Sequence, residues 1–267
     1  MELLIRPTPR HAARLAARMI AERVRADPGL VLGCATGSTM DAVYDALVEL
    51  VEAGSLELRG CTTFNLDEYV GLPPNDERSY HHYMRTRLFE RVGLASDRTH
   101  LPDGMAADLR AEAAAYEGII RAAGGIDVQL VGLGKTGHIG FNEPLSSLMS
   151  RTREKALTPE TRRQNAAFFG GDPDDVPSRA LTMGVGTILD ARTVIMVVTG
   201  AHKATILAAA TEGPITARIS ATALQLHPNC TVVVDEGAAS ELEGHAYYRW
   251  IYEQEPEWER YRADPSL

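Results

Sequence analysis

The chain has 267 residues, of which 45% are hydrophobic and 24% charged, a composition typical of a globular protein that buries one substantial core. Its formal net charge of −9 argues against the broad basic surface of nucleic-acid-binding proteins, so an anionic ligand would have to meet a local cationic pocket. The three cysteines show no CxxC spacing, and the chain has neither a run of about 18 apolar residues nor a signal-peptide core. We therefore expect a cytoplasmic protein that contacts neither nucleic acid nor a membrane.

Short apolar runs rich in β-branched residues alternate along the chain with segments of helical period. Six runs are predicted as strands: 3–5, 30–34, 61–66, 128–133, 194–199 and 231–234. Helical spacing occurs at residues 40–52, 107–123 and 201–211. This alternation predicts an α/β fold, a doubly wound, mostly parallel open sheet flanked by helices, in one domain spanning residues 1–267. Ligands of such sheets bind beyond the carboxyl ends of the strands, so the residues that follow each strand are the site candidates.

The strand at 30–34 is followed by Ala35-Thr36-Gly37-Ser38-Thr39 and then by an amphipathic helix. Backbone N–H groups, hydroxyls and the positive end of the helix dipole would attract an anion there. We therefore predict a phosphate-binding loop made of Thr36, Gly37, Ser38 and Thr39. The alternative is that Ser38 or Thr39 merely caps the helix.

Two carboxylates, Asp67 and Glu68, follow the strand at 61–66. Adjacent carboxylates at a strand end cannot both face the core, so we expect one of them in the ligand crevice, where burial and neighbours could tune it as a base. Asp67 is the candidate. The alternative is that both are surface acids at the start of a loop.

Residues 132–144 (GLGKTGHIGFNEP) form the densest stretch of glycine and polar residues in the chain. They satisfy GxGxxG, but Gly140 and Pro144 follow where a dinucleotide-binding helix should run. Lys135 and Thr136 imitate the end of a Walker A loop, but Gln129 stands where that motif needs glycine. Neither nucleotide motif is therefore satisfied.

The same loop carries His138 and, five residues later, Glu143. Such a pair could transfer protons to and from a sugar ring oxygen, because the carboxylate would orient the imidazole and raise its basicity. A purely structural histidine is the alternative.

Lys203 lies in the first turn of the helix that follows the strand at 194–199. A helix N-terminus favours anions, so a lysine there would be explained by a bound phosphate. A solvated surface lysine is the alternative.

These segments, taken together, resemble the glucosamine-6-phosphate deaminase family over nearly the whole chain. The matching motifs are ATGST (35–39), FNLDEYVGLP (64–73), GHIGFNEP (137–144), SSLMSRTR (146–153), VGTILDA (185–191) and LQLHP (224–228). The resemblance implies an enzyme without metal or cofactor that isomerises and deaminates glucosamine 6-phosphate to fructose 6-phosphate and ammonia. It also leads us to expect a homo-oligomer.

By this resemblance Asp67 moves the proton between carbons 1 and 2 of the sugar, and His138 opens the ring with Glu143 as its partner. Residues 36–39 and Lys203 hold the 6-phosphate. A mobile helical flap, at about residues 153–182, closes over the sugar.

Two departures from the family pattern bear on activity. Thr136 stands where the family has an aspartate of the histidine relay, and a hydroxyl cannot stabilise imidazolium as a carboxylate would, so we expect slower ring opening. Ala167 stands where the family has an arginine that binds phosphate. Arg163, one helical turn earlier, is the candidate replacement.

Ser146, Arg153 and Lys155 match residues of a site at which N-acetylglucosamine 6-phosphate activates some family members. Those relatives have a threonine after the residue that Lys155 matches, and this chain has Ala156 there. They also have a C-terminal tyrosine, whose counterpart here is either Tyr248, at a shifted position, or Arg249. The sequence therefore argues against activation by this effector. We expect the aromatic segment 247–258 to pack on the domain or on a neighbouring subunit.

Two other functions stay open. A divergent paralogue would isomerise or dehydrate a related sugar phosphate, and Thr136 and Ala167 are the residues that favour it. A non-catalytic sugar-phosphate sensor would need a DNA-binding segment, which the sequence does not show. Lactonases and pentose-phosphate isomerases of similar architecture lack the paired FNLDEYVGLP and GHIGFNEP motifs.

Overall fold

A seven-stranded sheet forms the centre of the molecule in the computed structural model, which describes residues 1–264 and 266. All of its strand pairs are parallel. In spatial order the strands are β1 (Glu2–Arg6), β10 (Cys230–Asp235), β9 (Thr193–Val198), β6 (Val128–Gly132), β2 (Val31–Cys34), β3 (Thr62–Asn65) and β5 (Thr99–His100). From β2 the chain runs outward through β3 to β5 and then returns to β6 on the other side of β2. The crevice between β2 and β6 is therefore the topological switch point of the sheet.

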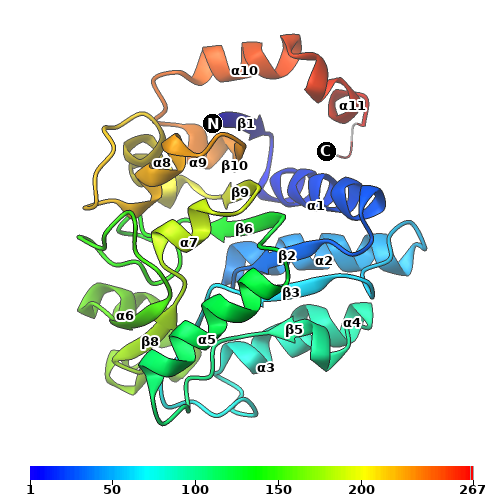
Figure 1. The fold of residues 1–267 in the computed structure, drawn as a ribbon. Coiled ribbons are helices and arrows are strands. Elements are labelled where there is room, and N and C mark those ends of the chain that lie inside the picture. The colour runs from blue at the N-terminus through cyan, green and yellow to red at the C-terminus, as the bar shows by residue number, and fades with distance from the viewer. Residues whose placement is uncertain (265, 267) are drawn as a thin grey trace.

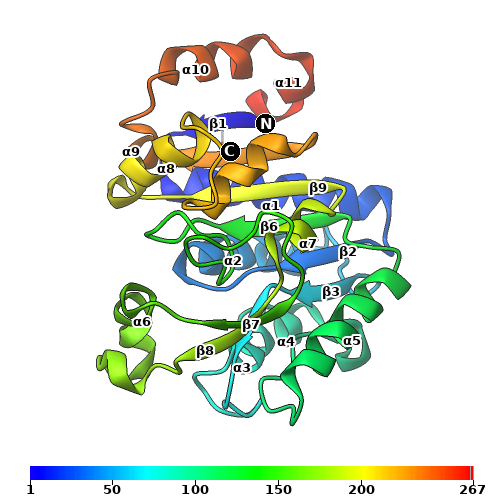
Figure 2. The ribbon, with the colours of Figure 1, turned by 60° about the vertical axis from the view of Figure 1, so that its left-hand side comes forward.

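Helices cover both faces of this sheet (Figures 1 and 2). Right-handed crossovers place α1 (Pro9–Ala26) and α2 (Ser38–Glu52) on one face. They place α5 (Leu109–Ala122), α7 (Val185–Leu189) and α8 (Ala204–Thr211) on the other. The strands between these layers are nearly continuous apolar runs because both of their faces are buried. The predicted doubly wound architecture is confirmed. Each of the six predicted strands and three predicted helices has a counterpart in the structure.

A second, three-stranded antiparallel sheet was not predicted. It contains β4 (Asp67–Tyr69), β8 (Arg179–Thr182) and β7 (Arg153–Ala156), in that order. Between β7 and β8 lie α6 (Pro159–Asn165) and two 3-10 turns, Ala166–Phe169 and Pro173–Asp175. This layer, beside the main sheet in Figure 2, has an apolar cluster of its own that includes Tyr69, Phe141 and Phe169. The sheet joins the strand that carries Asp67 to the segment expected to form the flap.

The remaining helices lie at the two ends of the sheet. A short helical segment after β4 consists of α3 (Tyr80–Met84), the π-helical turn Arg85–Phe89 and α4 (Glu90–Val92). At the other end, after α9 (Glu236–Ala239), α10 (His245–Gln254) and α11 (Glu259–Arg262) lie over the β1 edge in Figure 1.

The aromatic C-terminal segment packs on its own domain. Tyr252 and Trp258 are buried, and the hydroxyl of Tyr261 donates a hydrogen bond to Glu22 of α1 at 2.7 Å. Tyr247 and Trp250 stay exposed. No helix among the residues that the structure describes is both long and apolar enough to span a bilayer.

Candidate active site

A cavity of about 460 Å³ opens at the switch point, beyond the carboxyl ends of β2 and β6. Its walls come from the loops after β2, β6 and β9, from β4, from residues 77–83 and from α6 with the turn that follows it. All four predicted strand ends therefore contribute to one cavity.

The predicted phosphate loop forms one end of the cavity. Gly37 is the N-cap of α2, with φ at +112°, a conformation that residues with a Cβ rarely adopt. No side chain caps this helix, and Ser38 is its first residue, so the alternative in which Ser38 or Thr39 serves as the cap is wrong. Thr36, Gly37, Ser38 and Thr39 all line the cavity, and the uncapped helix end offers its backbone N–H groups to an anion.

Lys203 lines the same cavity and is buried, so the alternative of a solvated surface lysine is wrong. Its ammonium donates a hydrogen bond to the carbonyl of Leu133 at 2.7 Å. Burial and, to a smaller extent, the charge of Lys135 lower the pKa of Lys203 to about 8. A bound phosphate would reverse both effects by supplying an opposite charge.

Asp67 begins β4 and pairs with Thr182 of β8, and its buried side chain lines the cavity. A Cβ at Gly140 would lie 3.3 Å from Oδ2 of Asp67, so the absence of a side chain there makes room for the carboxylate. Burial and, to a smaller extent, the negative charge of Glu68 raise the pKa of Asp67 to about 8, against the opposing effect of the backbone N–H of Phe141. Such a carboxylate is a much stronger proton acceptor than an exposed aspartate.

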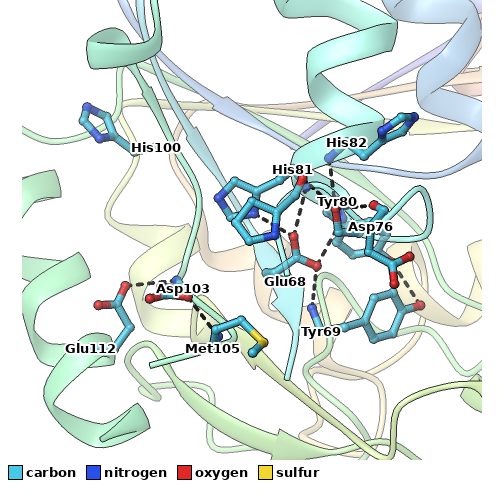
Figure 3. Close-up of polar contacts among 12 residues, drawn as sticks. Glu68, Tyr69, Asp76, Tyr80, His81, His82, His100, Asp103, Met105 and Glu112 are labelled. Carbon is cyan, nitrogen blue, oxygen red and sulfur yellow. Dashed lines mark hydrogen bonds and ion pairs between the residues drawn. The ribbon is translucent and has the colours of Figure 1, made fainter. Parts of the chain in front are cut away.

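Glu68 is also buried, and it points to the other side of β4, into the N-terminus of α3 (Figure 3). It accepts hydrogen bonds from the backbone N–H groups of Tyr69, Tyr80 and His81, and it contacts the His81 ring. The expectation that only one of the two carboxylates faces the interior is therefore wrong, as is the alternative of two surface acids. Glu68 is tolerated inside because each of its oxygens has donors.

His138 lies in the glycine-rich loop, with its ring packed directly on the backbone of Gly134. A Cβ at position 134 would lie 2.1 Å from Nε2 of the histidine, so only glycine fits there. Nδ1 lies 2.8 Å from the hydroxyl of Thr136 and 3.8 Å from a carboxylate oxygen of Glu143. Burial lowers the pKa of His138, the charge of Lys203 adds to that effect, and Glu143 opposes it. The imidazole is therefore held in its neutral form, which can accept a proton.

Glu143 connects this histidine to the start of the flap segment. Its Oε1 accepts hydrogen bonds from the backbone N–H and the hydroxyl of Thr158, at 3.0 and 3.1 Å. Thr158 is the N-cap of α6. The other oxygen of Glu143 is buried without a hydrogen-bond partner among the described residues, and it is the one that faces His138.

Arg163, the predicted substitute for the missing phosphate ligand, does not reach the cavity. It forms an ion pair with Glu160 at 2.8 Å on the surface, and neither Arg163 nor Ala167 lines the cavity. The prediction assumed that Arg163 and Ala167 lie one turn apart on the same face of a helix. They do not, because α6 ends at Asn165 and a 3-10 turn follows.

The cavity wall also contains residues that the sequence interpretation missed. Lys135 and Arg78 add two cations, and Gln164 and Asn165 add amides from α6. Lys135 could have been found, because it stands three residues before His138 in the loop already singled out. No sequence pattern singled out Arg78, because it lies in a polar loop between β4 and α3 whose position beside the cavity depends on the tertiary fold.

The three residues matched to an effector site lie outside the cavity lining. Arg153 donates a hydrogen bond to the side chain of Asn142 at 2.7 Å, and Ser146 is buried. Lys155 follows Arg153 by two residues on β7, so the two share a face of that strand. Their role stays a prediction.

Comparison with known proteins agrees with this geometry. Residues 7–233 match the family described as glucosamine-6-phosphate isomerases/6-phosphogluconolactonase. The chain is 47% identical to a glucosamine-6-phosphate deaminase of Streptomyces coelicolor, over 97% of this chain and 99% of the relative. It is also 47% identical to the deaminase of Hahella chejuensis, over 94% and 95% of the two chains.

Solved structures agree with these matches. A monomeric glucosamine-6-phosphate deaminase, 40% identical, superposes with a TM-score of 0.88 over 90% of this chain and all of the other. A 6-phosphogluconolactonase from Trypanosoma cruzi, 21% identical, superposes with a TM-score of 0.71 over 91% and 97% of the two chains, which shows the shared fold alone. The chain belongs to the glucosamine-6-phosphate isomerase/6-phosphogluconolactonase family, and within it to the glucosamine-6-phosphate deaminases.

Proposed function

We propose that this chain converts glucosamine 6-phosphate to fructose 6-phosphate and ammonia, without a metal. The observation that carries the proposal is the content of one cavity: a buried carboxylate with a raised pKa, an imidazole with a lowered pKa, a helix N-terminus and a buried ammonium. These groups are Asp67, His138, residues 36–39 and Lys203. They supply two proton carriers and one anion site to a single small ligand.

In this proposal His138 takes the proton of the anomeric hydroxyl and passes it to the ring oxygen, which opens the pyranose to the aldehyde. Asp67 then takes the proton from carbon 2 and returns it to carbon 1, while a proton passes from the amino group to the oxygen on carbon 1. The imine left at carbon 2 adds water and releases ammonia. Thr136 and Glu143 orient the imidazole, and the phosphate held at residues 36–39 and Lys203 fixes carbons 1 and 2 against Asp67.

We further propose that residues 153–182 close over the bound sugar. Thr161, Gln164 and Asn165 of α6 already line the cavity, and Phe168, beside them, is 58% exposed. An aromatic side chain at the rim could cover the ligand when the segment moves inward. Closure of this kind excludes water from the reacting groups.

Location and association are part of the same proposal. We place the protein in the cytoplasm because its three cysteines are free and buried. We propose a homo-oligomer because Leu145 and Met149, in neighbouring turns, are 75% and 79% exposed, which is unusual for such apolar side chains. Sedimentation velocity tests this association, and a monomer, as in the solved 40% identical relative, would overturn it.

Ammonia release tests the proposed reaction directly. The wild-type protein is incubated with glucosamine 6-phosphate, with galactosamine 6-phosphate and with unphosphorylated glucosamine, and the Asp67→Asn variant serves as the control. We expect ammonia and fructose 6-phosphate from the first substrate, far less from unphosphorylated glucosamine, and at least about a hundredfold slower release from the variant. Binding of the phosphorylated sugars without release of ammonia would favour the sensor or the divergent isomerase.

A further inference from the structure

Glu68 is a buried carboxylate for which the proposed reaction has no direct use. The side chain is fully buried, yet its two oxygens have four contacts. Oε1 accepts from the backbone N–H groups of Tyr69 and Tyr80 at 2.8 and 3.1 Å. Oε2 accepts from the backbone N–H of His81 at 2.9 Å and lies 2.8 Å from Nδ1 of the same residue. Figure 3 shows the carboxylate pointing into this set of donors.

These contacts join two parts of the cavity wall. Side chains alternate along a strand, so Asp67 and Tyr69, on either side of Glu68, face the cavity while Glu68 faces α3. The segment that Glu68 binds contributes Ser79 and Tyr80 to the same cavity. Glu68 therefore fixes the position of the strand that carries Asp67 relative to the wall segment that contains Ser79 and Tyr80.

Glu68 also acts on Asp67 through its charge. The carboxylate that three N–H donors and the His81 ring hold in place lies one residue from Asp67. The charge of Asp67 acts on Tyr69 of β4, Tyr80 of α3 and Tyr116 of α5, and His138 lines the same cavity. Across the cavity stand three cations, Arg78, Lys135 and Lys203. Glu68 is the charged neighbour that raises the pKa of Asp67.

We propose that Glu68 and His81 are positioning residues for proton transfer: Glu68 holds Asp67 in the cavity wall and its charge strengthens Asp67 as a proton acceptor, while His81 holds the Glu68 carboxylate. The part that concerns turnover rests on the role proposed above for Asp67. The part that concerns charge does not depend on the reaction. Figure 3 also labels other titratable side chains in the region of Glu68 and His81, namely Asp76, His82, His100, Asp103 and Glu112.

The first test compares Glu68→Gln with the wild type. Glutamine keeps the shape of glutamate and removes the charge, so the pKa of Asp67 falls and its base form persists at lower pH. We expect the acid limb of the profile of kcat against pH to move down by about one pH unit, and the plateau to fall about tenfold because a weaker base abstracts the proton more slowly. KM should stay within about twofold, since Glu68 does not line the cavity. Glu90→Gln, an exposed glutamate on α4, is the matched control.

A readout without turnover separates this inference from the proposed function. Carboxyl ¹³C NMR of the substrate-free protein gives the titration of Asp67 in the wild type and in Glu68→Gln. We expect the variant to titrate at lower pH even if no amino sugar is ever deaminated. Equal titration curves in two folded proteins would overturn the inference, whatever the enzyme does.

The His81 variants cover the case in which Glu68→Gln does not fold. The side chain of His81 is 26% exposed, so the position should tolerate exchange. His81→Phe removes the ring contact to Glu68, and we expect kcat to fall several-fold at unchanged KM. His81→Asn, whose amide can donate from a similar place, should recover most of that loss. Equal kcat in His81→Phe and the wild type would overturn the role of His81.

Discussion

The hydroxyl of Thr136 lies 2.8 Å from Nδ1 of His138, a full ångström closer than the nearest carboxylate oxygen of Glu143. A neutral group therefore orients the ring that we expect to open the sugar, while the charge that could stabilise its protonated form lies farther off. Hydrogen bonds fix a tautomer, but an imidazolium gains much more from an adjacent carboxylate than from a hydroxyl. The histidine is well placed and weakly basic.

Thr136→Asp should correct this weakness. A carboxylate at Nδ1 raises the pKa of His138, and we expect single-turnover ring opening of glucosamine 6-phosphate to become about tenfold faster. Rapid-quench measurement of the first turnover detects this change even where product release limits steady-state kcat. Thr136→Ser keeps the hydroxyl and is the control. An unchanged first turnover in Thr136→Asp would show that the missing charge does not limit ring opening.

Asp67 should dominate the acid side of the pH profile. The pKa of Asp67 in the ligand-free protein is about 8, and only the ionised carboxylate can take the proton from carbon 2. kcat/KM should therefore be low at pH 6 and rise as the pH passes through about 8, opposite to the behaviour expected of an exposed aspartate, which is ionised throughout this range. Asp67→Asn should lower kcat by roughly 10²–10⁴. A pH-independent rate between about 6 and 8 would contradict the assignment.

Lys203 and Arg163 should differ sharply in phosphate binding. Lys203→Met removes a buried ammonium beside the phosphate loop, and charged hydrogen bonds are worth about 1.5–3 kcal/mol, so we expect KM for glucosamine 6-phosphate to rise roughly 10- to 150-fold. Arg163→Ala breaks only a surface ion pair and should leave KM within about twofold. Isothermal titration with inorganic phosphate gives the same comparison without turnover. Weaker phosphate binding by Arg163→Ala than by the wild type would show that Arg163 contributes to the phosphate site.

Thr158 should connect the stability of the flap to catalysis. Thr158→Val removes the N-cap of α6, which contributes about 1 kcal/mol to stability. It also removes the hydroxyl that donates a hydrogen bond to Glu143. We expect faster limited proteolysis within residues 153–182 and a several-fold lower kcat. Thr158→Ser should restore both. A variant with normal proteolysis and low kcat would assign the effect to Glu143 alone.

The sequence predicted the large sheet because its strands are buried on both faces, which leaves long apolar runs such as 128–133. It did not predict the small sheet. Asp67–Tyr69 and Arg153–Ala156 are short and polar, and they form strands only because β8 pairs with both of them. Pairing between segments so far apart in the chain leaves no local pattern.

The candidate site was predicted to a similar extent. Motifs pointed to Asp67, which follows β3 closely, and to His138, which lies in the glycine-rich loop after β6, and both residues line the cavity. They could not locate Arg163, because its side of the helix depends on where α6 gives way to a 3-10 turn. They also could not show that Glu68 is satisfied inside the protein, because three of its donors come from two residues of α3 and one from its own strand.

The small sheet has a mechanical consequence. Thr182 of β8 stands opposite Asp67 on one side and opposite Arg153 on the other. An outward movement of β7 or β8 would therefore break this ladder or carry Asp67 along with it, whereas residues 157–178 lie outside both pairings. If the ladder holds during such a movement, the position of the Asp67 carboxylate changes together with that of the small sheet.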